Sequence, residues 1–499
     1  MTVSPIGGGD LSSKEFGDEG PIPFQYPSYF SCSNVYTLTA LPDTEGGYVF
    51  DYWTIQTATG TTASSSTTIT VPVAEDKTVT AHFVDPSTVI SVYYPHVTTR
   101  SPWQTEIALV NTSSNQAVTG VLKAFSDTGT LVDIMDITLA RNGRRQIIVA
   151  SEFPRHAEIG YFVFVTDVNA IRGYTKLYQS GVYRTAIPAV TENNASDVYI
   201  SHIASNDTFW TGISLVNTNL ASKRPTITFN DGRTYSLTMA PGEHKFFTID
   251  SLFGGQPQPD IKSGVISNAA GIIGLELFGT DTQLDGILLT DDTTSTIYYP
   301  HVADMTKWWT GIVAYNPANT ACAITITPYS AAGQALTPSS VNIGAKAKYV
   351  GVVKNLGLPA DTAWFKIDAA QPLSGFELFG TLDGKQLAAY AEGSGAGAKR
   401  GVFAKIEKSG WTGIAFVNTE STAASVTLTA YSNSGTALAT KAISVGTHAK
   451  VVNLAENIFA PQSITNATYI AFTSSRNVVG FQLNGSSDDT MLDGLPSLK

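Results

Sequence analysis

Three histidines of this chain lie in closely similar sequence contexts. His96, His202 and His301 each precede a tryptophan by seven or eight residues. Imidazole is a frequent zinc ligand and general base. Each histidine falls in a different copy of a repeated unit, however, so separate domains would not bring three of them to one zinc ion. The fourth copy has Lys405 in this place. We therefore expect each imidazole to bond to local backbone groups.

The tryptophans of the same units have two interpretations. Trp210 follows a phenylalanine, and Trp308 and Trp309 are adjacent. An aromatic side chain here can close one end of a hydrophobic core, or it can present a flat face to the C–H groups of a sugar. Because successive side chains of a strand point to opposite faces, one member of each aromatic pair should face outward. The candidate ligand-binding residues are therefore Trp210, Trp308, Trp309, His96, His202 and His301.

Two clusters of aspartates are the only residues whose type suggests a bound cofactor. Their carboxylates are oxygen donors that suit Ca²⁺, although their spacing matches no EF-hand loop, so we expect solvated loop acids and no cofactor, with Ca²⁺ as the alternative. The groups are Asp281, Asp285, Asp291 and Asp292, and then Asp488, Asp489 and Asp493.

Sequence motifs of the common enzymes are absent. The chain has no G-x-S-x-G elbow, no H-E-x-x-H motif and no P-loop. Paired carboxylates for glycoside cleavage need only spatial proximity, so sequence neither identifies nor removes them. We expect a protein without enzymatic activity.

Repetition dominates the organisation of the chain. Trp103, Trp210, Trp309 and Trp411 lie 107, 99 and 102 residues apart, so each unit has the size of a domain. A turn ending in glycine also recurs in every unit, and Asn or Asp before Gly suits a tight hairpin. Repetition points to an architectural or binding array.

The first unit contains eight short strand-like segments. This density of strands and turns predicts tandem immunoglobulin-like β-sandwich repeats in an all-β chain. The same segments could instead form two four-stranded blades per unit, which would close an eight-bladed β-propeller. One helical turn is expected near residues 150–153 and its counterparts. The predicted strands are 89–97, 105–111, 117–125, 131–139, 144–150, 160–166, 172–178 and 182–190.

A smaller all-β module precedes the repeats. Its segments 36–40, 47–53 and 77–83 read YTLTA, GYVFDYW and KTVTAHF; the first and third alternate with period two, as does 68–71, and the second follows a turn. This pattern resembles the internalin B-repeat-like bacterial repeat domains of bacterial surface proteins. The resemblance implies a spacer or adhesive module in an extracytoplasmic setting and no catalytic residues. The large units likewise resemble the Trp-Thr-Gly-Ile-Ala-Leu-Val-Asn type repeats of secreted or surface proteins, a group that implies no biochemical activity.

These segments divide the chain into six parts. We expect a leader or linker at 1–34 and the bacterial-repeat-like module at 35–86. Four β-repeats follow at 87–192, 193–291, 292–396 and 397–499.

Charge and composition exclude several classes of partner. A net charge of −11 does not suit nucleic acid, and no apolar run is long enough to span a bilayer. Cys32 and Cys322 form no metal or disulfide pattern, and we expect Cys322 in a core. The N-terminus has no signal peptide, so we expect a trimmed or partial chain of a larger product.

Together these features predict a non-catalytic extracellular or cell-surface structural or adhesive repeat protein, with a glycan, a surface protein or a second copy as its partner. The alternatives are a carbohydrate-binding array built on exposed aromatic residues and, behind it, a propeller-fold hydrolase.

Overall fold

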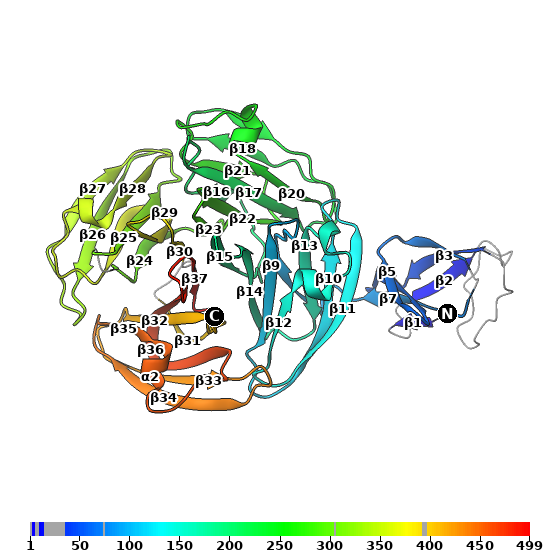
Figure 1. The fold of residues 1–499 in the computed structure, drawn as a ribbon. Helices are drawn as coiled ribbons and strands as arrows, with labels where there is room; N and C mark the ends of the chain where they lie inside the picture. Colours follow the sequence, from blue (N-terminus) through cyan, green and yellow to red (C-terminus); the bar gives the residue numbers. More distant parts are fainter. Residues whose placement is uncertain (1, 5–8, 14–34, 73–74, 304–305, 392–396) are drawn as a thin grey trace.

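The computed structural model describes residues 2–4, 9–13, 35–72, 75–303, 306–391 and 397–499, and it is almost entirely β-structure. The chain forms a small N-terminal module and four β-sandwiches (Figure 1). Cys32 lies outside the described residues, and Cys322 is fully buried in a core, as predicted.

The N-terminal module packs two sheets, β1-β7-β4-β5 and β2-β3-β6, around the fully buried Trp53. The indole Nε1 donates to the carbonyl of Ser66 at 2.9 Å. The expected leader at 1–34 differs from this structure, because β1 pairs with β7 and β2 pairs with β3; the remainder of that span lies outside the described residues. The strands are β1 (Thr2–Ser4), β2 (Gly9–Ser13), β3 (Val35–Pro42), β4 (Val49–Thr57), β5 (Gly60–Ser64), β6 (Thr68–Pro72) and β7 (Thr78–Val84).

Repeat 1 is a sandwich of two four-stranded sheets, ordered β11-β10-β13-β8 and β12-β9-β14-β15. Apolar side chains from both sheets form one core, in which Leu109 of β9 and Phe164 of β13 are fully buried. Its strands are β8 (Ile90–Tyr94), β9 (Gln104–Asn111), β10 (Val118–Phe125), β11 (Leu131–Leu139), β12 (Arg144–Ile148), β13 (Tyr161–Thr166), β14 (Ile171–Gln179) and β15 (Tyr183–Pro188).

Repeats 2 to 4 follow the same plan, except that one long strand crosses both sheets in repeats 3 and 4. Repeat 2 holds β16 (Val198–Ile200), β17 (Trp210–Asn217), β18 (Thr226–Phe229), β19 (Thr234–Ser236), β20 (His244–Thr248), β21 (Gly264–Ser267), β22 (Ile272–Gly279) and β23 (Leu284–Leu288). Repeat 3 holds β24 (Thr294–Tyr299), β25 (Trp308–Tyr315), β26 (Cys322–Tyr329), β27 (Ser339–Ile343), β28 (Lys348–Val352), β29 (Trp364–Thr381) and β30 (Leu387–Tyr390). Repeat 4 holds β31 (Ala398–Phe403), β32 (Gly410–Asn418), β33 (Ala424–Tyr431), β34 (Ala437–Val445), β35 (Lys450–Leu454), β36 (Tyr469–Ser486) and β37 (Leu492–Pro496).

Short helical turns follow the same strand in each repeat; those of repeats 1, 2 and 4 lie where the sequence predicts them, and that of repeat 3 was not predicted. They are α1 (Val149–Glu152), η3 (Asp250–Phe253), η4 (Val353–Leu356) and α2 (Ala455–Phe459), with one further turn at η2 (His156–Glu158).

Strand order confirms tandem β-sandwiches and shows that the propeller alternative is wrong. Consecutive strands such as β9 and β10 lie in opposite sheets of one sandwich, whereas a blade keeps its strands in one sheet. The four sandwiches nevertheless follow one another around a ring, and β15, β23, β30 and β37 meet at its centre (Figure 1). The N-terminal module lies outside the ring beside β11, where Lys123 pairs with Asp51 at 2.5 Å.

A recurring asparagine at the end of the second strand secures each sandwich. In repeat 1 the Asn111 Nδ2 donates to the carbonyls of Gln116 and Ala140, and its Oδ1 accepts from Ser113 N. The other three repeats use Asn217, Asn316 and Asn418 in the same way, so each of these side chains ties the end of a strand to the neighbouring turn.

Candidate binding clefts between repeats

Adjacent repeats meet at seams, and the recurring histidines lie there. At the seam between repeats 1 and 2, the turn residue Asp127 accepts a backbone hydrogen bond from His244 N at 2.9 Å. The same bond joins Ala331 to Lys450 between repeats 3 and 4 at 3.0 Å. These turns therefore hold neighbouring sandwiches together rather than only reversing the chain.

His96 of repeat 1 meets His244 of repeat 2 across the seam. Nδ1 of His96 lies 3.2 Å from Nε2 of His244, whose Nδ1 lies 2.8 Å from the Asp127 carboxylate. Burial, together with the neighbouring His244, lowers the pKa of His96 to about 3. His96 is therefore neutral at physiological pH, and the expectation of a purely local backbone partner is wrong because the partner comes from the next repeat.

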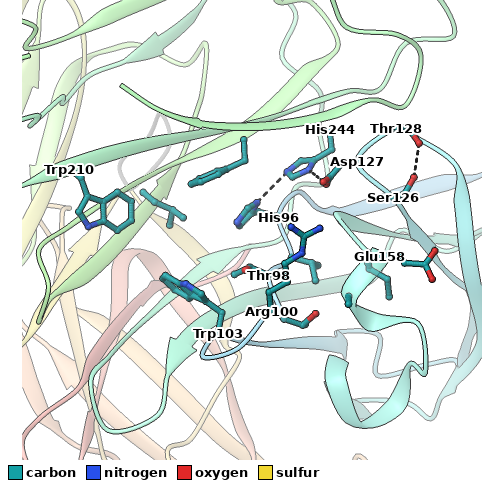
Figure 2. A pocket seen from close by; sticks show the side chains of 16 residues that line it. His96, Thr98, Arg100, Trp103, Ser126, Asp127, Thr128, Glu158, Trp210 and His244 are labelled. Carbon is teal, nitrogen blue, oxygen red and sulfur yellow. Dashed lines mark hydrogen bonds and ion pairs between the residues drawn. The ribbon is translucent and has the colours of Figure 1, made fainter. Parts of the chain in front are cut away.

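Aromatic side chains form one side of the cleft between repeats 1 and 2, which we name the polar cleft. Trp103 and Trp210 come from successive repeats and face the same space (Figure 2). Phe246 and Leu277 extend this apolar side. The cavity has a volume of about 490 Å³, within the range typical of small-molecule sites.

Charged and hydroxyl side chains form the opposite side of the polar cleft. Arg100, Asp127 and Glu158 lie there, across the cavity from the two tryptophans (Figure 2). The Asp127 side chain is 68% exposed, so its carboxylate is open to a ligand even while it accepts from His244. Beside it, the hydroxyls of Ser126 and Thr128 lie 2.9 Å apart. The cleft thus combines a flat apolar side with a side that carries a cationic donor, two anionic acceptors and two hydroxyls.

Ser214, His244 and Asp127 have the distances of a hydrolase triad, but the serine is not presented to a ligand. The Ser214 Oγ lies 2.9 Å from His244 Nε2. That oxygen also donates to the carbonyl of Pro95 at 3.1 Å, and Ser214 is fully buried and does not line the cleft. A nucleophile must reach the reacting carbonyl as well as its base. This arrangement therefore orients the imidazole.

A second cleft, which we name the apolar cleft, lies at the equivalent place between repeats 3 and 4. Its cavity has a volume of about 590 Å³. Trp308 and Trp411 line it, together with His301, the counterpart of His96. Burial lowers the pKa of His301 well below its usual value, and Lys450 contributes to the same effect. This imidazole is therefore also neutral.

The structure distributes the six candidate residues over three seams. His96 and Trp210 share the polar cleft, and Trp308 and His301 share the apolar cleft. Trp309 lies in a shallower depression beside Trp308, and both indoles are partly exposed. His202 lies between repeats 2 and 3, where its Nδ1 is 2.9 Å from Lys348 Nζ.

Several residues of the polar cleft belong to no sequence pattern that would identify them as binding residues. His244 and Asp127 come from different repeats and are not part of the recurring strings that mark the tryptophans. Phe246 is one of two adjacent phenylalanines on β20, and its 44% exposure marks it as a surface group. No pattern within either repeat places these residues together, because their contact depends on how the two sandwiches meet.

The acidic groups do not form a calcium site in the structure. Asp285 and Asp493 are fully buried on β23 and β37, so their assignment to solvated loops is wrong. Asp291 accepts hydrogen bonds from the backbone of Ala195 and Ser196. Within the described residues, no group of three or more His, Cys, Asp or Glu side chains is placed to hold a metal ion.

Comparison with known proteins identifies the N-terminal module. Residues 2–87 match the divergent InlB B-repeat domain family. No curated protein matches the chain. Among solved structures, the chain is similar to SGBP-B of the mixed-linkage glucan utilization locus of Bacteroides ovatus, in complex with a mixed-linkage heptasaccharide. The identity is 11%, the match covers 74% of this chain and 92% of that one, and the TM-score of 0.12 is too low to support an argument.

The family match confirms the predicted resemblance and extends the module to the first strands of the chain. Such modules occur in bacterial surface proteins. Among the described residues, no helix is long and apolar enough to cross a membrane.

Proposed function

We propose that this protein is a non-catalytic, extracellular adhesive protein that binds carbohydrate in the polar cleft. The observation that carries this proposal is the pairing of Trp103 and Trp210, from two repeats, opposite a side of charged and hydroxyl groups. A role in adhesion is supported by the ring of repeats that presents the cleft and by the module of a surface-protein family beside it.

Sugar rings offer two kinds of surface, and the cleft offers a match for each. The C–H face of a pyranose is apolar and packs on an indole, which contributes a large contact area at a small cost in conformational entropy. The hydroxyls lie around the ring edge, where a guanidinium donates and a carboxylate accepts. Arg100 supplies the first group, and Asp127 and Glu158 supply the second.

Geometry across the seam supports a preorganised site. Asp127 is held from two directions, since its carbonyl accepts from His244 N and its carboxylate contacts the His244 ring. The hydrogen bond to His244 holds the pKa of Asp127 below its usual value although burial opposes this, so the carboxylate is ionised at neutral pH. A fixed acceptor costs a ligand less ordering entropy than a mobile one.

Binding to a glycan and polysaccharide array, followed by calorimetry on any sugar that binds, tests the proposal. Trp210→Ala should weaken binding about fivefold to 150-fold, if stacking of a sugar on the indole is worth about the 1–3 kcal/mol that stacking of a base on an aromatic side chain contributes. Trp309→Ala is the matched control, because Trp309 holds the same repeat position in a different seam. It should retain wild-type affinity.

Three results would refute the proposal. They are a blank array from folded protein, unchanged affinity in Trp210→Ala, and equal loss of affinity in both variants. A chelator should not change binding, since the cleft supplies its own charges.

A further inference from the structure

The apolar cleft differs from the polar cleft at matched positions. The turn residue that accepts the seam hydrogen bond is Asp127 in the polar cleft and Ala331 in the apolar cleft. The strand residue that donates this bond is His244 in one and Lys450 in the other. Lys450 directs its Nζ away to the carbonyl of Ala363 at 2.9 Å, so it does not restore the missing charge. The two clefts therefore have the same backbone hydrogen bond at the seam but different side chains beside it.

Carbon-rich side chains line the apolar cleft. Among the described residues, its polar side chains are those of His301 and Asn453, and neither carries a charge at neutral pH. Val452 and Leu454 stand at its edge with 52% and 41% of their surface exposed. Its other large apolar side chains are Trp308, Trp411, Phe379, Phe481, Ile414 and Leu483.

A second apolar depression adjoins this cleft. Trp308 lines both cavities, and the second one has a volume of about 380 Å³. Its other lining residues include Trp309, Val352 and Leu382, the last with 63% of its surface exposed. Lys354 is the charged residue described in its lining. Trp308 is therefore the side chain that the two depressions share, and we name the cleft and the second depression together the apolar track.

We propose that this track binds the alkyl chain of an amphiphilic molecule. An alkyl chain needs no hydrogen bonds along its length, and the carbon-rich side chains that line the cleft and the adjoining depression offer it apolar contact. The track binds a different class of ligand from the polar cleft and does not depend on that cleft's function.

Fluorescence of N-phenyl-1-naphthylamine, an uncharged apolar probe, tests the track directly on the full chain. The probe should bind saturably, and 1-decanol should displace it while 1-butanol at the same concentration should not. Val452→Glu places a carboxylate at the edge of the track and should weaken probe binding at least about tenfold, because a charge must be desolvated to keep the ligand.

Val350→Glu provides the matched control for this variant. Val350 occupies the corresponding position on β28, is also 52% exposed, and does not line the track. The proposal requires Val350→Glu to bind the probe as the wild type does and both variants to keep the wild-type melting temperature.

Unchanged probe binding in Val452→Glu would overturn the proposal, and so would equal loss in both variants or failure of decanol to displace the probe. Should Val452→Glu unfold, Leu454→Gln gives a second, uncharged test of the same edge. These outcomes are independent of sugar binding.

Discussion

Replacing Arg184 with methionine should destabilise the ring at the seam where it closes. Arg184 of repeat 1 lies 2.6 Å from Asp493 and 3.0 Å from Glu407, both in repeat 4. It also donates to the carbonyl of Asn484 at 2.7 Å. Arg184 and Asp493 are 3% and 0% exposed, so the change leaves carboxylates that water cannot reach.

Removing one partner of a buried ion pair costs about 3–5 kcal/mol. Here Lys405 stays within 3.2 Å of Asp493 and 3.0 Å of Glu407, and it compensates part of the loss. We therefore expect Arg184→Met to lower the free energy of unfolding by about 3 kcal/mol, at the lower end of that range. Urea titration at pH 7, followed by tryptophan fluorescence, measures this quantity.

Arg155→Met is the control, since Arg155 pairs with Glu158 at the surface and both side chains are more than half exposed. It should cost at most about 0.5 kcal/mol. A change below about 1 kcal/mol in Arg184→Met would refute the reasoning that this seam depends on its charges.

The pH dependence of this difference is also fixed by the structure. Burial opposes the ionisation of Asp493, but Lys405 and Arg184 outweigh it and hold the pKa of that carboxyl below its usual value. A depressed carboxyl pKa contributes stability above the unfolded value of about 3.9, and this contribution is lost as pH falls through the folded pKa. The difference between wild type and Arg184→Met should therefore shrink below pH 4.

Three further predictions concern other buried polar groups. Burial raises the pKa of Asp285 to about 8. Its contribution to stability is therefore full below about pH 4 and is lost as pH rises toward 8. The melting temperature of Asp285→Asn should rise relative to wild type between pH 5 and pH 8, and a pH-independent difference would contradict this. Lys123→Met removes the ion pair to Asp51 and should let the N-terminal module swing away from the ring, which small-angle scattering would detect as a larger radius of gyration and an unchanged value would exclude. Ser214→Ala should cost about 1–2 kcal/mol through its lost buried hydrogen bonds and should also weaken glycan binding, because the His244 ring that holds Asp127 loses its orienting partner; unchanged stability and affinity would argue against an orienting role.

Strand positions within a repeat could be predicted closely from the sequence. The expected strand at 131–139 coincides with β11, and the turns near residues 150, 250 and 455 are found where expected. These features depend on period-two alternation and on turn residues, which are local properties of the chain. Asp285 and Asp493 were misplaced because Leu-Asp-Gly has the composition of a turn, whereas the central strands bury it against another repeat.

The clefts could not be predicted in the same way, because their partners are remote in sequence. His96 and His244 are 148 residues apart, and Arg184 and Asn484 are 300 apart. No periodicity links such pairs. Their contact follows from the ring, and the ring follows from how each sandwich meets the next.

The four seams use one set of positions for different chemistry. The His96 position holds His, His, His and Lys in successive repeats, and the residue that meets it from the next repeat is His244, Lys348, Lys450 or Arg144. At the closing seam Arg144 Nε donates to the carbonyl of Ala404 at 2.9 Å.

Two of the four seams bring a pair of tryptophans together. Trp103 meets Trp210 in the polar cleft, and Trp308 meets Trp411 in the apolar cleft. At the closing seam the same two positions hold Gly410 and Gln104, so no indole pair can form there. Charged groups fill that seam instead, and a buried charge is stable only when its partner is in place. The contact between the first and last repeats therefore depends on keeping Arg184 beside Asp493 and Glu407.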